Sequence, residues 1–251
     1  MKNQEELSDS KSSSLKTKIG TLFAIGTGPS SSDFLTEQAK KAICSSETIF
    51  YPSTKKSSKA FDFVKKQVDV SQKKCEPLLF SMTKDEKISK REYECAKEKI
   101  EDALKVGNIA LLTIGDVSIC STAAKIARLV KNDGFPVRFV SGISSISASF
   151  SALCLDLGSS ESLFVTAGDR AFLSNEIPKI LSEKGAKAFI KMKKYLPQII
   201  QEIKTAGRLS YSHLVFHVGS ADELIFSNDD LLTLPENIIQ EQYMSVLIVE
   251  G

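Results

Sequence analysis

Apolar positions along this chain follow two spacings in turn, one typical of buried strands and one typical of helices. Short runs of apolar and β-branched residues predict strands at residues 21–25, 48–51, 109–114 and 136–140. Apolar residues three or four positions apart predict helices around Ala39 and Ala42, at residues 84–104 and at residues 123–130. Strands that alternate with helices favour parallel pairing through right-handed crossovers. The first part of the chain is therefore predicted to be an α/β domain, with a mostly parallel sheet and helices on both faces.

The pattern changes after the serine-rich segment at residues 144–153. Strands are predicted at residues 163–167, 188–191, 213–218, 224–226 and 244–249, and helices at residues 172–181 and 196–203. Because the last three strands follow one another without helices between them, we expect a mixed or antiparallel sheet with helices packed on it.

These two patterns predict two α/β domains with a ligand cleft between them. We place the boundary near residues 141–146, which gives an N-terminal domain at residues 19–143 and a C-terminal domain at residues 144–251. The polar, serine-rich residues 1–18 are predicted to form a disordered tail.

Composition is that of an ordinary globular protein, and it disfavours several classes of partner. The 33 Lys and Arg residues nearly balance 31 Asp and Glu residues, so nucleic-acid binding, which favours a strongly basic domain, is not indicated. No apolar run is long enough to span a bilayer, and the first residues lack the apolar core of a secretory signal. The 5 cysteines are scattered without a CxxC pair, which fits reduced thiols. We therefore expect a cytoplasmic protein without a membrane partner.

Two other features have competing interpretations. His213 and His217 are the only histidines, and we expect them to be hydrogen-bonded or surface residues with no metal site. Residues 55–74 hold seven lysines and two aspartates, with Phe61 and Val64 at helical spacing. This segment is either a solvated amphipathic helix or a basic wall that faces an acidic ligand.

A glycine-rich turn follows the first predicted strand and reads Gly26-Thr27-Gly28-Pro29. Ser31 stands where a dinucleotide fingerprint has its third glycine, and Tyr51-Pro52 ends the second strand where such folds place an acidic residue. A nicotinamide enzyme is therefore not favoured. The turn either lets a ligand lie close to the main chain or is purely structural.

A second candidate site is Gly115-Asp116, directly after the predicted strand at residues 109–114. Open α/β sheets bind ligands at this carboxyl edge, and a carboxylate there can accept hydrogen bonds from a ribose diol or attract a sulfonium cation. The alternative is that Asp116 caps a helix that begins near Ser121. Ser144-Ser145 begins the next helix, whose free N–H groups are available to the polar edge of a ligand.

The motifs in their order resemble those of the tetrapyrrole methylases. They read GTLFAIGTGP, TIFYPS, FSMTKD, IALLTIGD followed by ST, FVSGISSISA and AFIK, and the resemblance covers nearly everything after Lys18. It implies a two-domain methyltransferase that takes S-adenosyl-L-methionine as methyl donor in the interdomain cleft, acts on a small-molecule tetrapyrrole and is generally a homodimer. Phe80 to Asp85, and Gly115-Asp116 followed by Ser121-Thr122, most resemble the precorrin-2 C20-methyltransferase branch, which belongs to cobalamin biosynthesis.

The resemblance also implies which residues contact the donor. Pro29 would lie beside it, Ile114, Gly115 and Asp116 would hold its ribose and amino-acid portion, and Ile119 would pack nearby.

The remaining contacts implied by the resemblance come from later in the chain. Ser121-Thr122 match the polar pair of the branch, and Ser144-Ser145 the pair that contacts adenosine. Ile190 falls where the family usually has methionine, and Gly219 near a glycine that approaches the adenine. No catalytic side chain is implied, because an electron-rich tetrapyrrole carbon is itself the nucleophile.

The chain departs from the family pattern around the same positions. Residues 30–32 are serines where the family has Gly-Asp-Pro, so Ser31 replaces an acidic residue on the substrate side, with Asp33 as a possible replacement for it. Three further differences are Val117 for a proline, Cys120 for an aromatic residue and Ser141 for a proline.

These departures keep two other functions open. One is the same fold acting on a different acceptor, such as a ribose of ribosomal RNA; the other is a diverged, non-catalytic module that binds the donor or mediates dimerisation. If the acceptor is an acidic tetrapyrrole, its carboxylates need cationic partners, for which the candidates are Lys55, Lys56 and Lys59, or Lys191 and Lys193.

Overall fold

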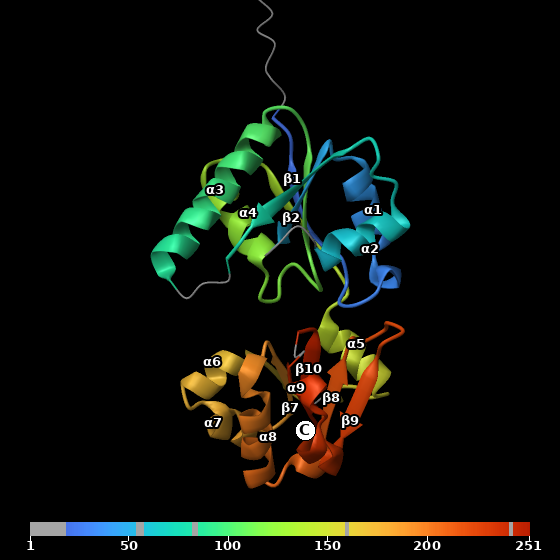
Figure 1. Ribbon diagram of the computed structural model, residues 1–251, viewed down its shortest axis with the longest axis vertical. Coiled ribbons are helices and arrows are strands. Elements are labelled where there is room, and N and C mark those ends of the chain that lie inside the picture. The colour runs from blue at the N-terminus through green and yellow to red at the C-terminus, as the bar shows by residue number, and fades with distance from the viewer. Residues whose placement is uncertain (1–18, 54–57, 82–84, 159–160, 241–242) are drawn as a thin grey trace, which may run out of the picture.

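The chain folds into two lobes stacked along the long axis of the molecule (Figure 1). The computed structural model describes residues 19–53, 58–81, 85–158, 161–240 and 243–251. The predicted tail at residues 1–18 lies outside the described residues, as do Lys55, Lys56 and residues 82–84 of the FSMTKD motif.

The first lobe contains a five-stranded sheet in which every pair is parallel. Its strands are β1 (Leu22–Gly26), β2 (Thr48–Ser53), β3 (Lys74–Leu79), β4 (Ile109–Thr113) and β5 (Val137–Val140), in the order β3-β2-β4-β1-β5. Leu22 of the central strand pairs with Ile109 on one side and Val137 on the other. The predicted α/β class with a parallel first sheet is confirmed.

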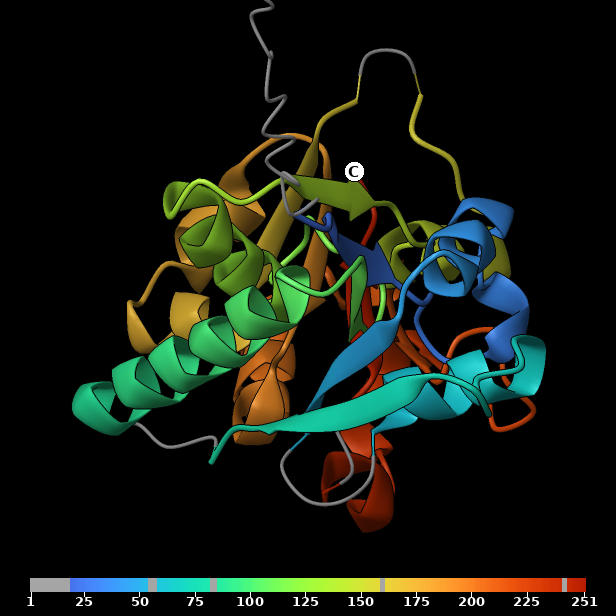
Figure 2. The same cartoon turned by 90° about the horizontal axis from the view of Figure 1, so that it is seen from above.

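Helices cover both faces of this sheet, with α3 and α4 on one side and α1 and α2 on the other (Figure 2). Their bounds are α1 (Glu37–Cys44), α2 (Lys59–Gln67), α3 (Glu86–Leu104) and α4 (Thr122–Asn132), and a 3-10 turn, η1 (Ser32–Phe34), precedes α1. Adjacent strand residues point to opposite faces, so Leu111 packs beneath α3 and α4 while Leu112 packs beneath α1 and α2. Both leucines are fully buried, which explains why β4 is a continuous apolar run.

The second lobe contains a mixed sheet, as predicted. Its strands are β6 (Leu163–Ala167), β7 (Ala186–Ile190), β8 (Ser212–Phe216), β9 (Leu224–Ser227) and β10 (Ser245–Val249), in the order β6-β7-β10-β8-β9. The pair β6–β7 is parallel and the other three pairs are antiparallel.

One face of the second sheet is covered by three helices and the other by α5 (Ser145–Ala152), which links the lobes (Figure 1). The three helices are α6 (Gly168–Leu173), α7 (Ile177–Ser182) and α8 (Leu196–Thr205). Shorter elements complete the lobe: η2 (Lys193–Tyr195), η3 (Leu209–Tyr211), η4 (Asn228–Thr233) and α9 (Glu236–Gln240).

One predicted helix was wrong, and one strand was not predicted. The helix predicted at residues 172–181 is broken between α6 and α7, because Asn175 adopts a left-handed conformation (φ +55°) and Pro178, in the first turn of α7, has no N–H to continue an earlier helix. The lysine-rich segment is helical only in α2, and β3 follows it. Charged residues and Pro77 concealed this strand, which they can occupy because β3 lies at the sheet edge.

Among the described residues, no helix combines the length and apolar character needed to cross a membrane.

Candidate functional site

Three loops meet at the carboxyl edge of the first sheet, on the side of the second lobe (Figure 1). Gly28 and Gly115 form an isolated antiparallel bridge, in which the Gly115 N–H donates to the Gly28 carbonyl at 2.8 Å. The N–H and the hydroxyl of Thr27 both donate to the carbonyl of Thr113, at 2.9 and 3.0 Å. Main-chain hydrogen bonds therefore fix the loop after β1 to the loop after β4.

Glycines let these loops approach closely, and one of them, Gly115, leaves space beside its main chain. A Cβ on Gly26 would lie 2.5 Å from the Gly115 oxygen, and one on Gly142 would lie 2.4 Å from the same oxygen, so neither position accepts a side chain. Gly115 differs, because it has a positive φ of +73° and a Cβ there would meet nothing within 4 Å. Space is therefore left where a side chain of Gly115 would stand, although the residue itself is buried.

Asp116 ties the loop after β4 to the loop after β5. One carboxylate oxygen, Oδ2, accepts from the Gly142 N–H at 3.0 Å. The other, Oδ1, accepts from the N–H of Ser118 at 2.7 Å and from the Ser118 hydroxyl. The alternative prediction that Asp116 caps the following helix was wrong, because the N-cap of α4 is Ser121. Asp116 is a half-buried carboxylate whose orientation is fixed before any ligand arrives.

The predicted serine and threonine pairs lie at two helix N-termini. The Ser121 hydroxyl accepts from the Ala124 N–H at 3.2 Å and donates to the Thr113 hydroxyl at 3.2 Å, and Thr122 is the first residue of α4. The N-termini of α4 and α5 therefore both point their positive ends at this edge.

At the second of these N-termini, Ser144 caps α5, accepting from the Ile146 N–H at 3.1 Å, and Ser145 begins the helix. The hydroxyls of Ser121 and Ser144 are used in capping. Their helices leave further N–H groups of the first turn for a ligand.

The apolar candidates occupy different surroundings. Pro29 is buried in the loop after β1, and Ile114 packs into the core between the first sheet and its helices α1 and α2. Ile119 and Ile190 belong to one apolar cluster although they come from different lobes. This cluster brings the loop after β4 against the end of β7, as a ligand site between the lobes requires.

Gly219 is in contact with a residue that the sequence pattern did not single out. A Cβ on Gly219 would lie 2.2 Å from Cε2 of Phe34, and a Cβ on Gly28 would lie 2.3 Å from the Cβ of Phe34. Phe34 therefore spans from the loop after β1 to the second lobe, where it packs with Val215 and Val218. The space beside Gly219 is filled on this side. The sequence signal that could have pointed to Phe34 is a lone aromatic residue in a polar loop.

An apolar hollow of about 360 Å³ adjoins two of the candidate residues, Ile119 and Ser144. It lies between α5, the edge strand β6 and the segment that joins them. Its lining is Ile119, Ser144, Ile146, Ser147, Phe150, Leu155, Asp156, Leu157, Leu163 and Val165.

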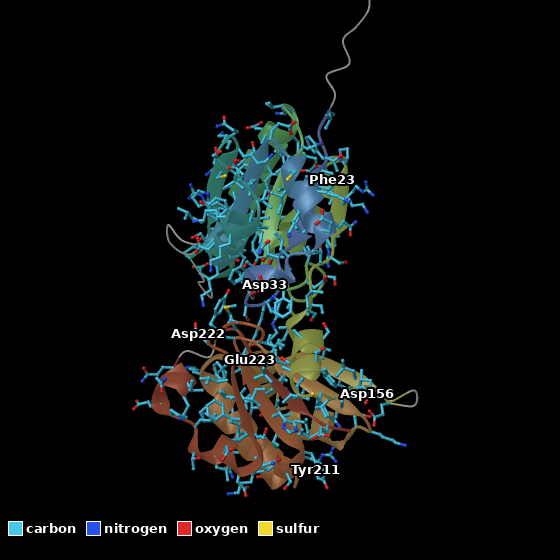
Figure 3. All side chains as sticks on the ribbon, turned by 90° about the vertical axis from the view of Figure 1, so that its right-hand side faces the viewer. Phe23, Asp33, Asp156, Tyr211, Asp222 and Glu223 are labelled. Carbon is cyan, nitrogen blue, oxygen red and sulfur yellow. The ribbon has the colours of Figure 1, made fainter. Side chains whose placement is uncertain are left out.

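Acidic residues face one another at one side of the junction between the lobes. Figure 3 shows Asp33 at the lower edge of the first lobe and Asp222 and Glu223 at the facing edge of the second. Asp33 accepts a long hydrogen bond of 3.5 Å from Gln67, while Glu223 accepts from the Gly219 N–H at 2.6 Å. Ser31, which replaces the acidic residue of the family pattern, caps η1 through its hydroxyl. Asp33 is thus the carboxylate that this loop presents to the junction.

The histidines belong to the second lobe and not to the three loops at the carboxyl edge of the first sheet. His213 bridges Ser227 and Glu250, at 2.8 Å from each. His217 follows β8 directly and has a positive φ of +46°. Within the described part of the chain, no three or more His, Cys, Asp or Glu residues are grouped so as to hold a metal ion.

A model of the family described as tetrapyrrole (corrin/porphyrin) methylases matches residues 21–230 of the chain. A curated relative, the probable cobalt-precorrin-2 C(20)-methyltransferase of Methanocaldococcus jannaschii, is 38% identical over 143 residues, which is 55% of this chain. The alignment spans 60% of that relative's length.

Two solved structures share the fold. The methyltransferase CobJ superposes with a TM-score of 0.63 at 14% identity, covering 92% of this chain and 95% of the other. The cobalt precorrin-4 methyltransferase CbiF, a cobalamin biosynthetic enzyme, superposes with a TM-score of 0.70 at 17% identity, covering 92% and 94%.

Proposed function

The chain belongs to the tetrapyrrole (corrin/porphyrin) methylase family, and we propose that it transfers the methyl group of S-adenosyl-L-methionine to a tetrapyrrole. The observation that carries the proposal is the 38% identity over 143 residues to the probable cobalt-precorrin-2 C(20)-methyltransferase. The acceptor we propose is accordingly the C20 carbon of precorrin-2 or of its cobalt form, a step of cobalamin biosynthesis.

The carboxyl edge of the first sheet has the features that an adenosyl sulfonium donor requires. The space left beside Gly115 admits close approach, and Asp116 supplies a negative charge of fixed orientation. The partly buried Ile119, packed on the cluster that contains Ile190, supplies apolar contact for a base. The Ser30 hydroxyl is buried next to Pro29 and has no hydrogen-bond partner among the described residues. A polar ligand would satisfy it, because buried hydroxyls are rarely left unpaired. The proposed donor contacts remain those that the family resemblance implies.

The main contribution of the protein to this reaction is to align the donor methyl group with the acceptor carbon. When the donor is bound, it supplies an electrophilic methyl group; the electron-rich acceptor carbon attacks in line with the C–S bond, and the acceptor then loses a proton. Holding the reacting partners in line is worth roughly 7–11 kcal/mol of the barrier. The tightly packed Gly26 and Gly142, together with the hydrogen bonds of Asp116, provide rigid loops for that task.

Anaerobic incubation of the purified protein with donor and either precorrin-2 or cobalt-precorrin-2, followed by mass spectrometry, tests this function. We expect the tetrapyrrole to gain the mass of one methyl group. Donor binding without any gain would support the non-catalytic alternative, and methylation of ribosomal RNA in a parallel incubation would support the other acceptor.

We also propose that the protein is a cytoplasmic homodimer. Support for a dimer comes from the apolar hollow beside the edge strand β6, where Leu157 and Val165 are exposed at 39% and 45%. An exposed apolar patch of this kind is typical of an interface. All five cysteines are free thiols, which fits a reducing compartment. Light scattering of the purified chain tests the dimer, and a monomeric mass at micromolar concentration contradicts it.

A further inference from the structure

The strand order divides the carboxyl edge of the first sheet into two halves. The loops after β1, β4 and β5 hold the proposed donor residues, and these three strands are neighbours in the order β3-β2-β4-β1-β5. The ends of β2 and β3 therefore remain for the acceptor. Tyr51 near the end of β2 stacks on Phe61 of α2, with ring centroids 4.4 Å apart, and burial raises the pKa of Tyr51. This half thus combines a largely buried aromatic stack with the start of the lysine-rich helix α2.

Lys59, the first residue of α2, reaches from this half to the second lobe. Its Nζ lies 3.3 Å from the Sδ of Met244, the residue before β10. A thioether is a weak acceptor, and Lys59 forms no ion pair within the described residues. Its ammonium is exposed and keeps donors for a ligand.

Lys191 reaches across the junction in the opposite direction. It follows β7 directly, and its Nζ donates to the main-chain carbonyl of Cys120, in the loop after β4. Like Lys59, it has no carboxylate partner in the part of the chain that the structure describes. The loop after β4 belongs to the donor half and borders the acceptor half, because β4 is the strand next to β2.

The two lysines contact the same corner of the second sheet. Val246 of β10 pairs with Ile190 of β7, so Met244 and Lys191 lie at neighbouring strand ends. Met244 precedes β10 and Lys191 follows β7, and both are in the left-handed conformation, with φ of +72° and +55°. His217, the residue after β8, is also left-handed, with φ of +46°. Such conformations cost free energy in residues other than glycine and cluster at functional sites.

We propose that Lys59 and Lys191 form a cross-lobe clamp for the carboxylates at the periphery of the acceptor, an inference that rests on the proposed function. The clamp takes a macrocycle that carries carboxylate side chains around its rim. One ammonium comes from each lobe, so an acidic acceptor is held on the β2 side while the donor occupies the β1, β4 and β5 side. The acidic residues of the junction, Asp33, Asp222 and Glu223, repel the same ligand and so favour its placement at the lysine corner.

Fluorescence titration with uroporphyrin, a porphyrin with carboxylates around its rim, tests the clamp on the full chain. The variants are Lys59→Gln and Lys191→Gln, and glutamine at position 191 can still donate to the Cys120 carbonyl. Lys204→Gln, an exposed lysine on α8, is the matched control. We expect each clamp variant to weaken uroporphyrin binding on the order of tenfold, as the loss of a charged hydrogen bond does. Lys59→Arg and Lys191→Arg should restore it, and the affinity for the donor should stay unchanged in all variants.

The clamp would be overturned by a uroporphyrin affinity that is unchanged in both variants, or by a loss of the same size in Lys204→Gln. Loss of donor binding together with uroporphyrin binding would also overturn it, because it would indicate a collapsed junction. A wild-type protein that binds uroporphyrin through these lysines but transfers no methyl group would support the clamp and contradict the proposed function. Methyl transfer with an unchanged acceptor KM in both variants would support the proposed function and contradict the clamp.

Discussion

The ring of Phe34, in the first lobe, occupies the space that a side chain on Gly219, in the second lobe, would need. A Cβ at position 219 would lie 2.2 and 2.3 Å from two ring carbons of Phe34, far inside van der Waals contact. A Cβ on Gly28, in the loop that carries Pro29, would likewise lie 2.3 Å from the Cβ of Phe34. Phe34 therefore fixes the position of the second lobe relative to the loop after β1.

Gly219→Ala should destabilise the protein by about 1–3 kcal/mol, because the added methyl group overpacks against Phe34. Chemical denaturation measures the change in the free energy of unfolding. Gly207→Ala is the matched control, since Gly207 also has a positive φ of +68° but a Cβ there would meet nothing within 4 Å. Equal losses in the two variants would show that backbone conformation alone, and not Phe34, requires glycine at position 219.

Asp116→Asn should weaken binding of the donor or of its demethylated product by about tenfold or more. The carboxylate accepts three hydrogen bonds that hold the loop after β4 against Gly142, and an amide group cannot accept all of them. Losing one charge-assisted bond is worth roughly 1.5–3 kcal/mol.

Isothermal titration calorimetry measures this change in affinity. Asp222→Asn, on the turn between β8 and β9, is the control, and it should bind the donor as the wild type does. Unchanged affinity in Asp116→Asn would remove Asp116 from the donor site.

Ser121→Ala and Ser144→Ala should each lower the free energy of unfolding by about 1 kcal/mol, since each serine caps a helix that begins at the site. Thermal and chemical denaturation check this. Ser147→Ala, on the exposed side of α5, is the comparison, and its loss should be smaller. If the cap variants match Ser147→Ala in stability, the capping bonds contribute nothing that water does not replace.

Lys187 should make stability depend on pH in the alkaline range. Its side chain is 2% exposed and its Nζ donates to the carbonyls of Glu183 and Gly185. Burial, and then the positive charge of Arg208, lowers the pKa of Lys187 below the ordinary lysine value. Between the lowered and the ordinary pKa the unfolded chain binds more protons than the folded chain, so the free energy of unfolding rises with pH.

Unfolding of Lys187→Met across the same pH range checks this prediction, because the variant should lack the part of the rise that Lys187 causes. Lys184→Met, at an exposed neighbouring position, should keep the slope of the wild type. Parallel curves for wild type and Lys187→Met would contradict the prediction.

The sequence predicted the elements in which buried apolar positions recur at a regular spacing. The strand at Ile109 and the helix that ends at Leu104 are each governed by apolar spacing, and both were found. Local chemistry that interrupts a pattern was harder to predict. Asn175 and Pro178 break a helix that its apolar residues alone would continue, and the strand β3 is concealed by its polar edge composition.

The candidate site was predictable where glycine and turn chemistry determine it, and less so where distant segments meet. Gly115 and Asp116 were singled out because a strand ends there, but the bond from Gly142 to Asp116 joins residues 26 positions apart. The contacts of Phe34 and Lys191 cross between the lobes, and no spacing within one element predicts them. The resemblance to a family indicated which loops converge, and the side chains that join the lobes required the structure.

A donor labelled with ¹³C in its methyl group tests the central claim most directly, by NMR of the tetrapyrrole recovered after anaerobic incubation with cobalt-precorrin-2. We predict that the label appears on C20 of the macrocycle, and that Asp116→Asn reduces its amount. A tetrapyrrole recovered without label, from protein that demonstrably binds the donor, would contradict the account.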